Sequence, residues 1–237
     1  MTCPVPLRLV LLLLVTVPVV AQAQSVGVKA GLNATTIFFD DDGLYEASLD
    51  KRARLGLVGG LSVDVPFSSA LGLRAEALYS QRGFANYSPE FEEGESFSED
   101  GTVTFQMDYV EVPVLLNVTV PVQSGLEIGV QGGLVPAFAV REVTSCDGLL
   151  GEFEGEPTDF CAPVDQDQDF GIRPFDLGGA LGATVGAGPF AVDLRYTLSL
   201  ADINEELDPD ARSFFFINGK TARHGVLSVT GVYRFGR

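Results

Sequence analysis

The chain has 237 residues and a net charge of −17, yet its mean hydropathy is positive. So acidic a chain is a very poor partner for nucleic acid, because the phosphate backbone would repel it. Since the chain is both acidic and apolar, its charged and apolar residues must be segregated. Beyond the N-terminal segment, no run reaches the roughly 18 apolar residues that a membrane-spanning helix requires.

The first 23 residues have the features of a cleaved secretory signal peptide. Arg8 supplies the positive charge, residues 9–20 form an apolar run, and "AQA" (21–23) is a typical cleavage motif. The run is too short and wrongly flanked for the alternative, a spanning helix. We expect the mature protein to begin at Gln24 and to leave the cytoplasm.

Two cysteines belong to the predicted mature chain, Cys146 and Cys161, and both lie in one polar segment. An even pair in an exported protein indicates a disulfide, which would close a short loop here. Because no histidine lies nearby in the sequence, the pair makes a poor zinc site. No cysteine stands at the cleavage site, so a lipoprotein is not expected.

Apolar segments of alternating character recur along the mature chain, and we interpret them as eight strands. Short turns and long polar loops alternate between them, which is typical of an all-β, antiparallel, up-and-down transmembrane β-barrel. A soluble sandwich shows no such strict alternation. The predicted strands span residues 25–38, 54–66, 70–84, 103–120, 125–140, 173–187, 189–201 and 222–236. The long loops are residues 39–53, 85–102, 141–172 and 202–221.

The phase of the predicted strands separates an apolar face from a polar face. In the seventh strand, for example, Phe190 and Leu194 fall on one face, and Asp193 and Arg195 on the other. Phase alone does not say which face points inward. Charged pairs beside glycines suit a narrow polar interior better than a solvent-exposed surface, which would carry more Lys and Glu. With the signal peptide, this pattern favours a membrane barrel.

Aromatic residues gather near both ends of the predicted strands, and we interpret them as two girdles at the membrane interfaces. The alternative is that aromatic residues simply favour strands. The girdle at the short turns would contain Phe67, Phe190, Tyr233 and Phe235. The girdle toward the long loops would contain Phe38, Tyr79, Phe84, Phe105, Tyr109, Phe138 and Phe175.

If the apolar faces meet lipid, charged residues of both signs point into the lumen. An eight-stranded barrel is just wide enough for side chains to fill it, and buried charges persist only when they are paired. We therefore expect a hydrogen-bonded plug; the functional alternative is a proton or ion pathway. The predicted network contains Lys29, Arg74, Glu76, Glu111, Glu127, Asp193, Arg195 and Arg234. Asn33, Gln131 and, near the turns, Asp64 would join it.

The fourth predicted strand carries Glu111 and Pro113 among valines and leucines. Its phase directs Glu111 into the lumen. Pro113 cannot donate to the ladder, and a closed barrel has no edge strand to hold it, so we expect a bulge or a local ladder break there. The expected partners of Glu111 are Arg74 on the neighbouring strand, or Lys29, Arg195 and Arg234 across the lumen.

Six segments carry a family resemblance: "VGVKAGLN" (26–33), "LGLRAEALYSQRG" (71–83), "YVEVPVLLNV" (109–118), "GVQGGLVPAF" (129–138), "FAVDLRYTLSLADI" (190–203) and "GVYRFG" (231–236). Together they resemble the porin-family, PorT-like outer-membrane β-barrels that are common in Bacteroidetes-type bacteria. The resemblance covers essentially the whole mature chain. It implies an eight-stranded barrel in the bacterial outer membrane, mostly without an assigned activity. The closing "YRF" looks like the signal that the barrel-assembly machinery reads, although Gly236 and Arg237 follow it here.

The long loops carry the acidic excess, and Asp165, Asp167 and Asp169 alternate as the ligands of calcium loops do. The segment lacks a glycine directly after the third acid and a bidentate glutamate at the proper distance. A weak calcium site is therefore one interpretation, and a solvated acidic surface is the favoured one. The loops could also reach lipopolysaccharide-like head groups through divalent cations, or a basic partner. No other cofactor is expected.

The sequence offers little support for an enzyme. His224 is the only histidine, and Ser228 follows it on the same face of the last predicted strand. Four residues along a strand span about 13 Å, which is beyond hydrogen-bond reach. A serine from another strand or loop is the open alternative.

The sequence therefore predicts a signal peptide (residues 1–23) and one outer-membrane barrel domain (residues 24–237). We expect a monomer that contacts outer-membrane lipid and, during biogenesis, the barrel-assembly machinery. The predicted role is structural or interactive, toward an unknown extracellular ligand or protein. The alternatives are a small-solute transport or channel protein, or a component of a secretion complex.

Overall fold

The computed structural model describes residues 25–39, 50–87, 102–123, 125–147, 150–153, 156–159, 173–202 and 222–235. The predicted signal peptide lies outside these residues. None of the described residues forms a helix long and apolar enough to cross a membrane. The main sheet contains β1 (Ser25–Phe39), β2 (Asp50–Pro66), β3 (Leu71–Tyr87), β4 (Thr102–Glu111), β5 (Val114–Gln123), β6 (Leu126–Asp147), β9 (Phe175–Ala187), β10 (Phe190–Ser199) and β11 (Ala222–Phe235). A separate hairpin joins β7 (Leu150–Phe153) and β8 (Glu156–Asp159).

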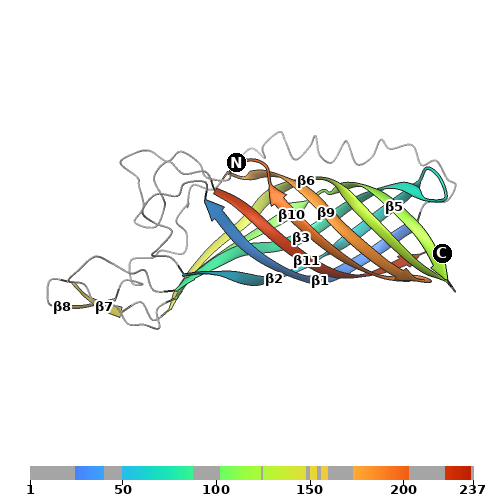
Figure 1. Ribbon diagram of the computed structural model, residues 1–237. Helices are drawn as coiled ribbons and strands as arrows, with labels where there is room; N and C mark the ends of the chain where they lie inside the picture. The colour runs from blue at the N-terminus through green and yellow to red at the C-terminus, as the bar shows by residue number, and fades with distance from the viewer. Residues whose placement is uncertain are drawn as a thin grey trace, which may run out of the picture.

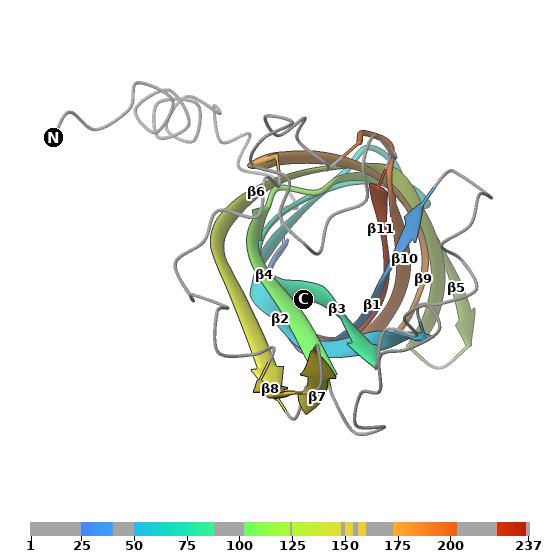
Figure 2. The ribbon, with the colours of Figure 1, turned by 90° about the vertical axis from the view of Figure 1, so that its left-hand side faces the viewer.

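The main sheet closes into a barrel, which Figure 1 shows from the side and Figure 2 along its axis. Apart from β4 and β5, consecutive strands of the main sheet pair in antiparallel fashion, and β1 closes the ring against β11. Because β4 and β5 occupy one position between β3 and β6, the ring has eight positions. The predicted eight-stranded up-and-down fold is confirmed.

The break between β4 and β5 lies at Val112 and Pro113. It is a local ladder break without a bulge, because Leu78 faces Glu111 and Ala75 faces Val114 in one unshifted register. The Pro113 carbonyl still accepts a hydrogen bond from the Glu76 amide (2.9 Å), but Pro113 has no N–H to return it. The expected disturbance at Pro113 is therefore present as a missing bond.

The nearest bulge lies elsewhere, between Asp108 and Tyr109 of β4, where β6 contains the additional residue Val140. A second proline accompanies Pro113 on β6. The Val112 amide donates to the Pro136 carbonyl (2.8 Å), and Pro136 likewise has no N–H to return a bond. Two adjoining strands therefore lose a ladder bond at nearly the same height.

The outward face of the barrel is apolar around the ring. In β10, buried and exposed residues alternate almost without exception, which puts Phe190, Val192 and Leu194 outside and Asp193 and Arg195 inside. The large outward apolar side chains are 36–72% exposed. Soluble proteins rarely expose an apolar surface this extensive, whereas a lipid-facing barrel requires it.

The aromatic residues follow the predicted girdles only in part. Phe67, Phe190, Tyr233 and Phe235 are exposed at the turn rim, as expected. Toward the loops, Phe38, Tyr79, Phe138 and Phe175 are also exposed. The prediction was wrong for three others: Phe84 and Phe105 are buried and stack at 4.7 Å, and Tyr109 is fully buried. Their strand phase directs these three rings into the interior.

Four strands extend beyond the ring on the loop side, toward the left of Figure 1. Pairing of β2 with β3 continues to Asp50 and Tyr87, and pairing of β4 with β6 continues to Thr102 and Asp147. Pairing of β6 with β9 ends at Phe138 and Phe175. These extensions, and the β7–β8 hairpin, occupy polar sequence that we had predicted as loops, because alternation of apolar and polar residues fades there.

Candidate functional site

The barrel interior contains the most concentrated chemistry of the described residues. All eight residues of the predicted network point inward: Glu127 is half-buried, and the others are at most 7% exposed (Lys29, Arg74, Glu76, Glu111, Asp193, Arg195 and Arg234). The period of two places them there, because each lies on the face of its strand opposite the lipid-facing residues. They belong to two networks, one near the turns and one near the loops, and to a separate ion pair at the turn rim.

The group nearer the turns, which we call the lower network, contains Lys29, Asp64, Arg74, Glu76, Asp193 and Arg195. Its centre is Glu76, which binds two cations from distant strands. The Lys29 Nζ lies 2.7 Å from Glu76 Oε1, and the Arg195 guanidinium binds both Glu76 oxygens at 2.8 and 2.9 Å. This carboxylate therefore joins β1, β3 and β10 across the lumen.

Asp193 of β10 joins the remaining members of the lower network. Its Oδ2 lies 2.7 Å from Lys29 Nζ and 3.0 Å from Arg74 Nη1, and its Oδ1 accepts a hydrogen bond from Thr184 at 2.6 Å. Arg74 Nε also binds Asp64 at 2.7 Å. Each buried charge thus has a partner of opposite sign, which is the condition under which buried charges persist.

Arg234 and Glu127 form a separate pair at 3.1 Å, close to the turn rim. Arg234 occupies room that a glycine leaves free on β9. A Cβ atom added to Gly186 would stand 3.0 Å from Arg234 Nη2, which is tighter than most contacts, so the guanidinium would have to shift. Gly186 thus leaves room on the inward face of β9 for the Arg234 side chain.

The group nearer the loops, which we call the upper network, contains Arg82, Glu111, Asp176 and Ser199. Arg82 is 1% exposed and binds Glu111 Oε1 at 2.8 Å and Asp176 Oδ2 at 2.8 Å. The Ser199 hydroxyl donates to Asp176 at 2.8 Å. The expected partners of Glu111 were wrong: its partner is Arg82, not Arg74, Lys29, Arg195 or Arg234.

Arg82 and Asp176 were absent from the predicted network, although their strand phase agrees with it. Arg82 lies two residues beyond the inward Ser80, close to the end of the predicted strand at residue 84. Asp176 lies at the beginning of β9, two residues before the inward Gly178. Extending the period of two to the strand ends would have found both.

Neutral residues separate the two networks. Asn33 donates to the Ser80 hydroxyl at 2.8 Å and accepts from the Ser228 hydroxyl at 2.7 Å. A cavity of about 10 Å³, lined by Lys29 and Arg195 below and by Arg82 and Glu111 above, lies between them. This is about the volume for a single water molecule. Among the described residues, the lumen between the networks is otherwise filled by side chains such as Val58, Leu78 and Val226.

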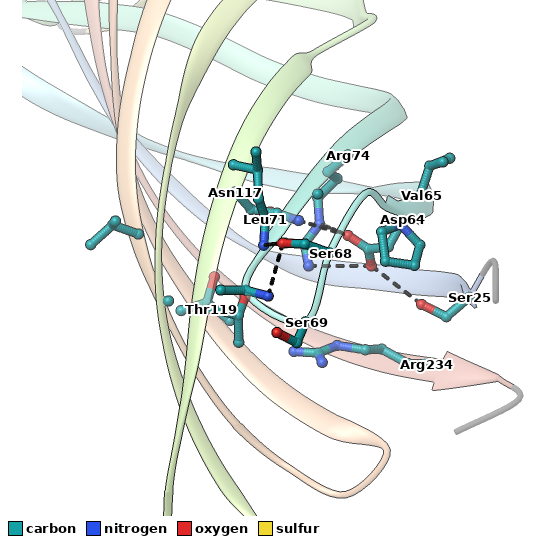
Figure 3. A pocket seen from close by; sticks show the side chains of 16 residues that line it. Ser25, Asp64, Val65, Ser68, Ser69, Leu71, Arg74, Asn117, Thr119 and Arg234 are labelled. Atoms are coloured by element: carbon teal, nitrogen blue, oxygen red, sulfur yellow. Dashed lines mark hydrogen bonds and ion pairs between the residues drawn. The ribbon is translucent and has the colours of Figure 1, made fainter.

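A larger cavity of about 320 Å³ opens at the turn rim, and we call it the vestibule (Figure 3). Figure 3 shows Asp64, Arg74 and Asn117 together on one side, and Arg234 on another. Asn117 Nδ2 donates to Asp64 at 3.2 Å, which ties this wall to the lower network. Because Arg74 and Thr184 line its inner end, the vestibule ends where the lower network begins.

The family model described as "Outer membrane protein beta-barrel domain" matches residues 21–205. The chain belongs to this family. It is an outer-membrane β-barrel protein, and its place is the bacterial outer membrane. In such barrels, the short turns face the periplasm and the long loops face the outside of the cell. The vestibule therefore opens to the periplasm, and the upper network lies on the extracellular side.

Several solved outer-membrane proteins are similar to this barrel. Neisserial surface protein A has 13% identity and a TM-score of 0.42, over 90% of this chain and 100% of that chain. Ail, the attachment invasion locus protein of Yersinia pestis, solved with sucrose octasulfate, has 15% identity and a TM-score of 0.39, over 90% and 100%. OprG from Pseudomonas aeruginosa has 13% identity and a TM-score of 0.44, over 91% and 97%. No curated protein matches the chain.

His224 of this outer-membrane barrel is fully buried in the lumen, where its ring meets Tyr109 edge-on at 5.8 Å. Neither ring nitrogen has a hydrogen-bond partner among the described residues. The Ser228 hydroxyl binds Asn33, and the Ser199 hydroxyl accepts from the His224 backbone amide at 3.1 Å. In the part of the chain described here, neither of these serine hydroxyls is hydrogen-bonded to the imidazole.

Other predicted sites lie outside the described residues. These are Cys161 and the candidate calcium ligands Asp165, Asp167 and Asp169. The backbone of Cys146 lies in β6 opposite Val103. Because Cys161 lies outside the described residues, the disulfide between the two cysteines stays a prediction. Within the described segments, no group of three or more His, Cys, Asp and Glu side chains is arranged to hold a metal ion.

Proposed function

We propose that this outer-membrane barrel is closed to solutes and acts through its extracellular side, in a structural or interactive, non-enzymatic role. The observation that carries the proposal is the pairing of Glu76 with both Lys29 and Arg195 at 2.7–2.9 Å. These three residues come from β3, β1 and β10, so their contacts cross the lumen. A solute would have to break buried ion pairs in order to pass, and breaking such pairs is costly.

Single-channel recording in planar bilayers tests this proposal. The purified protein should give no sustained ohmic openings. As a comparison, Glu76→Ala removes the carboxylate at the centre of the lower network, while Glu127→Ala removes one at the rim of the vestibule. Sustained openings of the wild-type protein at moderate voltage would contradict the closed barrel.

Small-solute transport is a second candidate, and the vestibule is the observation that favours it. Its 320 Å³ could admit a small polar solute from the periplasm, next to Asp64, Arg74 and Arg234. Uptake of such solutes into proteoliposomes, at a rate above that of empty liposomes, would support transport over the closed barrel.

We further propose that the protein is PorT-like within its family, as the six segments of the sequence indicate. Some members of that group belong to secretion or gliding machinery, which makes a secretion complex a third candidate. Its acidic loops would suit a partner with a basic surface. Co-purification after mild detergent extraction tests this candidate, because a monomer that elutes without partners would count against it.

A further inference from the structure

Two exposed arginines lie side by side on the outer wall of the barrel, above the outward aromatic residues of β6 and β9. The Arg141 side chain is 64% exposed, and Arg173 is exposed as well. The Ala139 amide donates to the Pro174 carbonyl at 2.8 Å, which continues the register of β6 and β9 by one residue. The next position sets Arg173 opposite Val140, and Val140 is the residue before Arg141.

The bulge in β6 is the reason that Arg141 points outward. Val140 is the additional residue there, so Val140, at 57% exposure, and Arg141 both lie on the outer side. Arg141 is paired in register with Asp108 of β4, which in turn is paired with Gln81 of β3. Without the bulge, alternation would direct Arg141 toward the interior.

Asp108 lies beneath Arg141 on this wall. Its carboxylate is buried beneath neighbouring side chains, with Oδ2 3.8 Å from Arg141 Nη1 and Oδ1 accepting from Gln106 Nε2 at 3.0 Å. Gln106 Oε1 in turn accepts from Arg54 Nη2 at 2.6 Å. Gln106 thus connects the Arg54 guanidinium to the carboxylate that faces Arg141, in a protein whose overall charge is −17.

The height of this cluster corresponds to the lipid head groups. Phe138 and Phe175, with rings 5.1 Å apart, and Tyr79 are 42–44% exposed and form the outward aromatic belt. Such belts mark the membrane interface. Arg141 and Arg173 lie three and two residues beyond the belt, which is within about 10 Å at about 3.3 Å per residue.

We propose that Arg141 and Arg173 bind a phosphate monoester on the saccharide head group of lipopolysaccharide in the outer leaflet. Guanidinium groups bind phosphate oxygens bidentately, and a phosphate monoester carries a charge of about −1.5 to −2 near neutral pH. Arg141, Arg173 and Asp108 together have a net charge of +1, which complements it. Asp108 faces Arg141 from below, and both guanidinium groups stay exposed toward the lipid.

Native mass spectrometry of the protein in detergent, with defined lipids, tests this site. The wild-type protein should retain diphosphorylated lipid A more tightly than the same lipid A without phosphates, and more tightly than phosphatidylglycerol. Arg141→Gln combined with Arg173→Gln should weaken retention of the diphosphorylated lipid by at least about tenfold. Val140→Gln, at the same place on the wall, is the matched control and should leave retention unchanged.

Two further outcomes decide the chemistry. Arg141→Lys combined with Arg173→Lys keeps both charges but loses the forked geometry, so retention should fall part of the way. The proposal is overturned if the Gln variant retains lipid A as the wild type does, or if phosphatidylglycerol binds as tightly as diphosphorylated lipid A. Heat-modifiable mobility on gels shows whether each variant is folded, so that a loss of binding is not a loss of the barrel.

Discussion

The two halves of the lumen hold their charges in different ways. In the lower network, charges of both signs are shared: Glu76 binds Lys29 and Arg195, and Asp193 binds Lys29 and Arg74. In the upper network, the shared member is a cation, Arg82, which binds Glu111 and Asp176. The loss of one carboxylate therefore has different consequences in the two halves.

This difference shows that the stability contributed by a buried carboxylate depends on how many partners its cations keep when it is removed. A missing Glu76 leaves two buried cations with fewer partners, whereas a missing Glu111 leaves Arg82 with Asp176. Glu76 also lies deeper than Glu111, since the Glu76 side chain is fully buried and the Glu111 side chain is 9% exposed. We therefore expect the stability of the barrel to depend more on its lower half.

Glu76→Ala should have the largest effect. Removing one partner of a buried ion pair costs about 3–5 kcal/mol, because the remaining charges stay buried without compensation. Urea unfolding in lipid vesicles, followed by tryptic digestion or gel mobility, measures the loss. The matched change at the rim, Glu127→Ala, is the control. An unfolding midpoint equal to that of the wild type would mean that the lower network does not hold the barrel together.

Glu111→Ala should destabilise the barrel by a smaller amount, about 1–3 kcal/mol, because Arg82 keeps Asp176 as a partner. Thermal melting in detergent compares it directly with Glu76→Ala. Asp176→Ala should behave similarly, since it leaves Arg82 with Glu111. If Glu111→Ala proves as harmful as Glu76→Ala, the contrast between the two halves is wrong.

Glu127→Ala should lower the free energy of unfolding by about 1 kcal/mol or less. Its side chain is 16% exposed at the vestibule, where water screens the pair with Arg234. The same urea titration measures it, and raising the salt concentration should shrink the difference from wild type. A loss above that of Glu111→Ala would show that the rim matters more than the depth of burial suggests.

The double variant Glu76→Ala with Glu111→Ala gives the smallest expected signal, a deviation from additivity. The two carboxylates share no ion-pair partner in the described structure, so their effects should add to within about 0.5 kcal/mol. A double-mutant cycle on unfolding free energies measures the coupling. A coupling well above this value would mean that the two networks act as one, for example through the small cavity between them.

Strand phase was enough to predict the lower network, because Lys29, Glu76 and Asp193 lie in the middle of strands with clean alternation. Phase could not predict the pairs, since the partner across a barrel depends on strand tilt and register, which the local sequence does not contain. Glu111 illustrates this: four cations were reasonable partners, and a fifth, Arg82, is the one it binds. Arg82 and Asp176 escaped prediction because alternation is weakest near strand ends.

The outward cluster at Arg141 and Asp108 was equally hard to foresee. It depends on the bulge at Val140, and no glycine or proline marks that position in the sequence. Pro113 had the reverse character. The sequence made it conspicuous, yet the register passes through it unshifted, because the missing N–H removes one bond and leaves the side chains of Glu111 and Leu115 on the same face.

Pro113 and Pro136 also bear on the mechanical design of the barrel wall. Around most of a closed sheet, backbone hydrogen bonds join each strand to both neighbours. At these two prolines, two neighbouring bonds of the ladder are missing, because neither proline has an N–H to donate. The amide of Glu76 donates to Pro113, and the carboxylate of Glu76 reaches Lys29 on β1 and Arg195 on β10. Where the wall lacks these backbone hydrogen bonds, ion pairs of the Glu76 side chain therefore connect strands across the lumen. Those ion pairs can form only after the ring has closed, so this level of the barrel should become rigid late in folding.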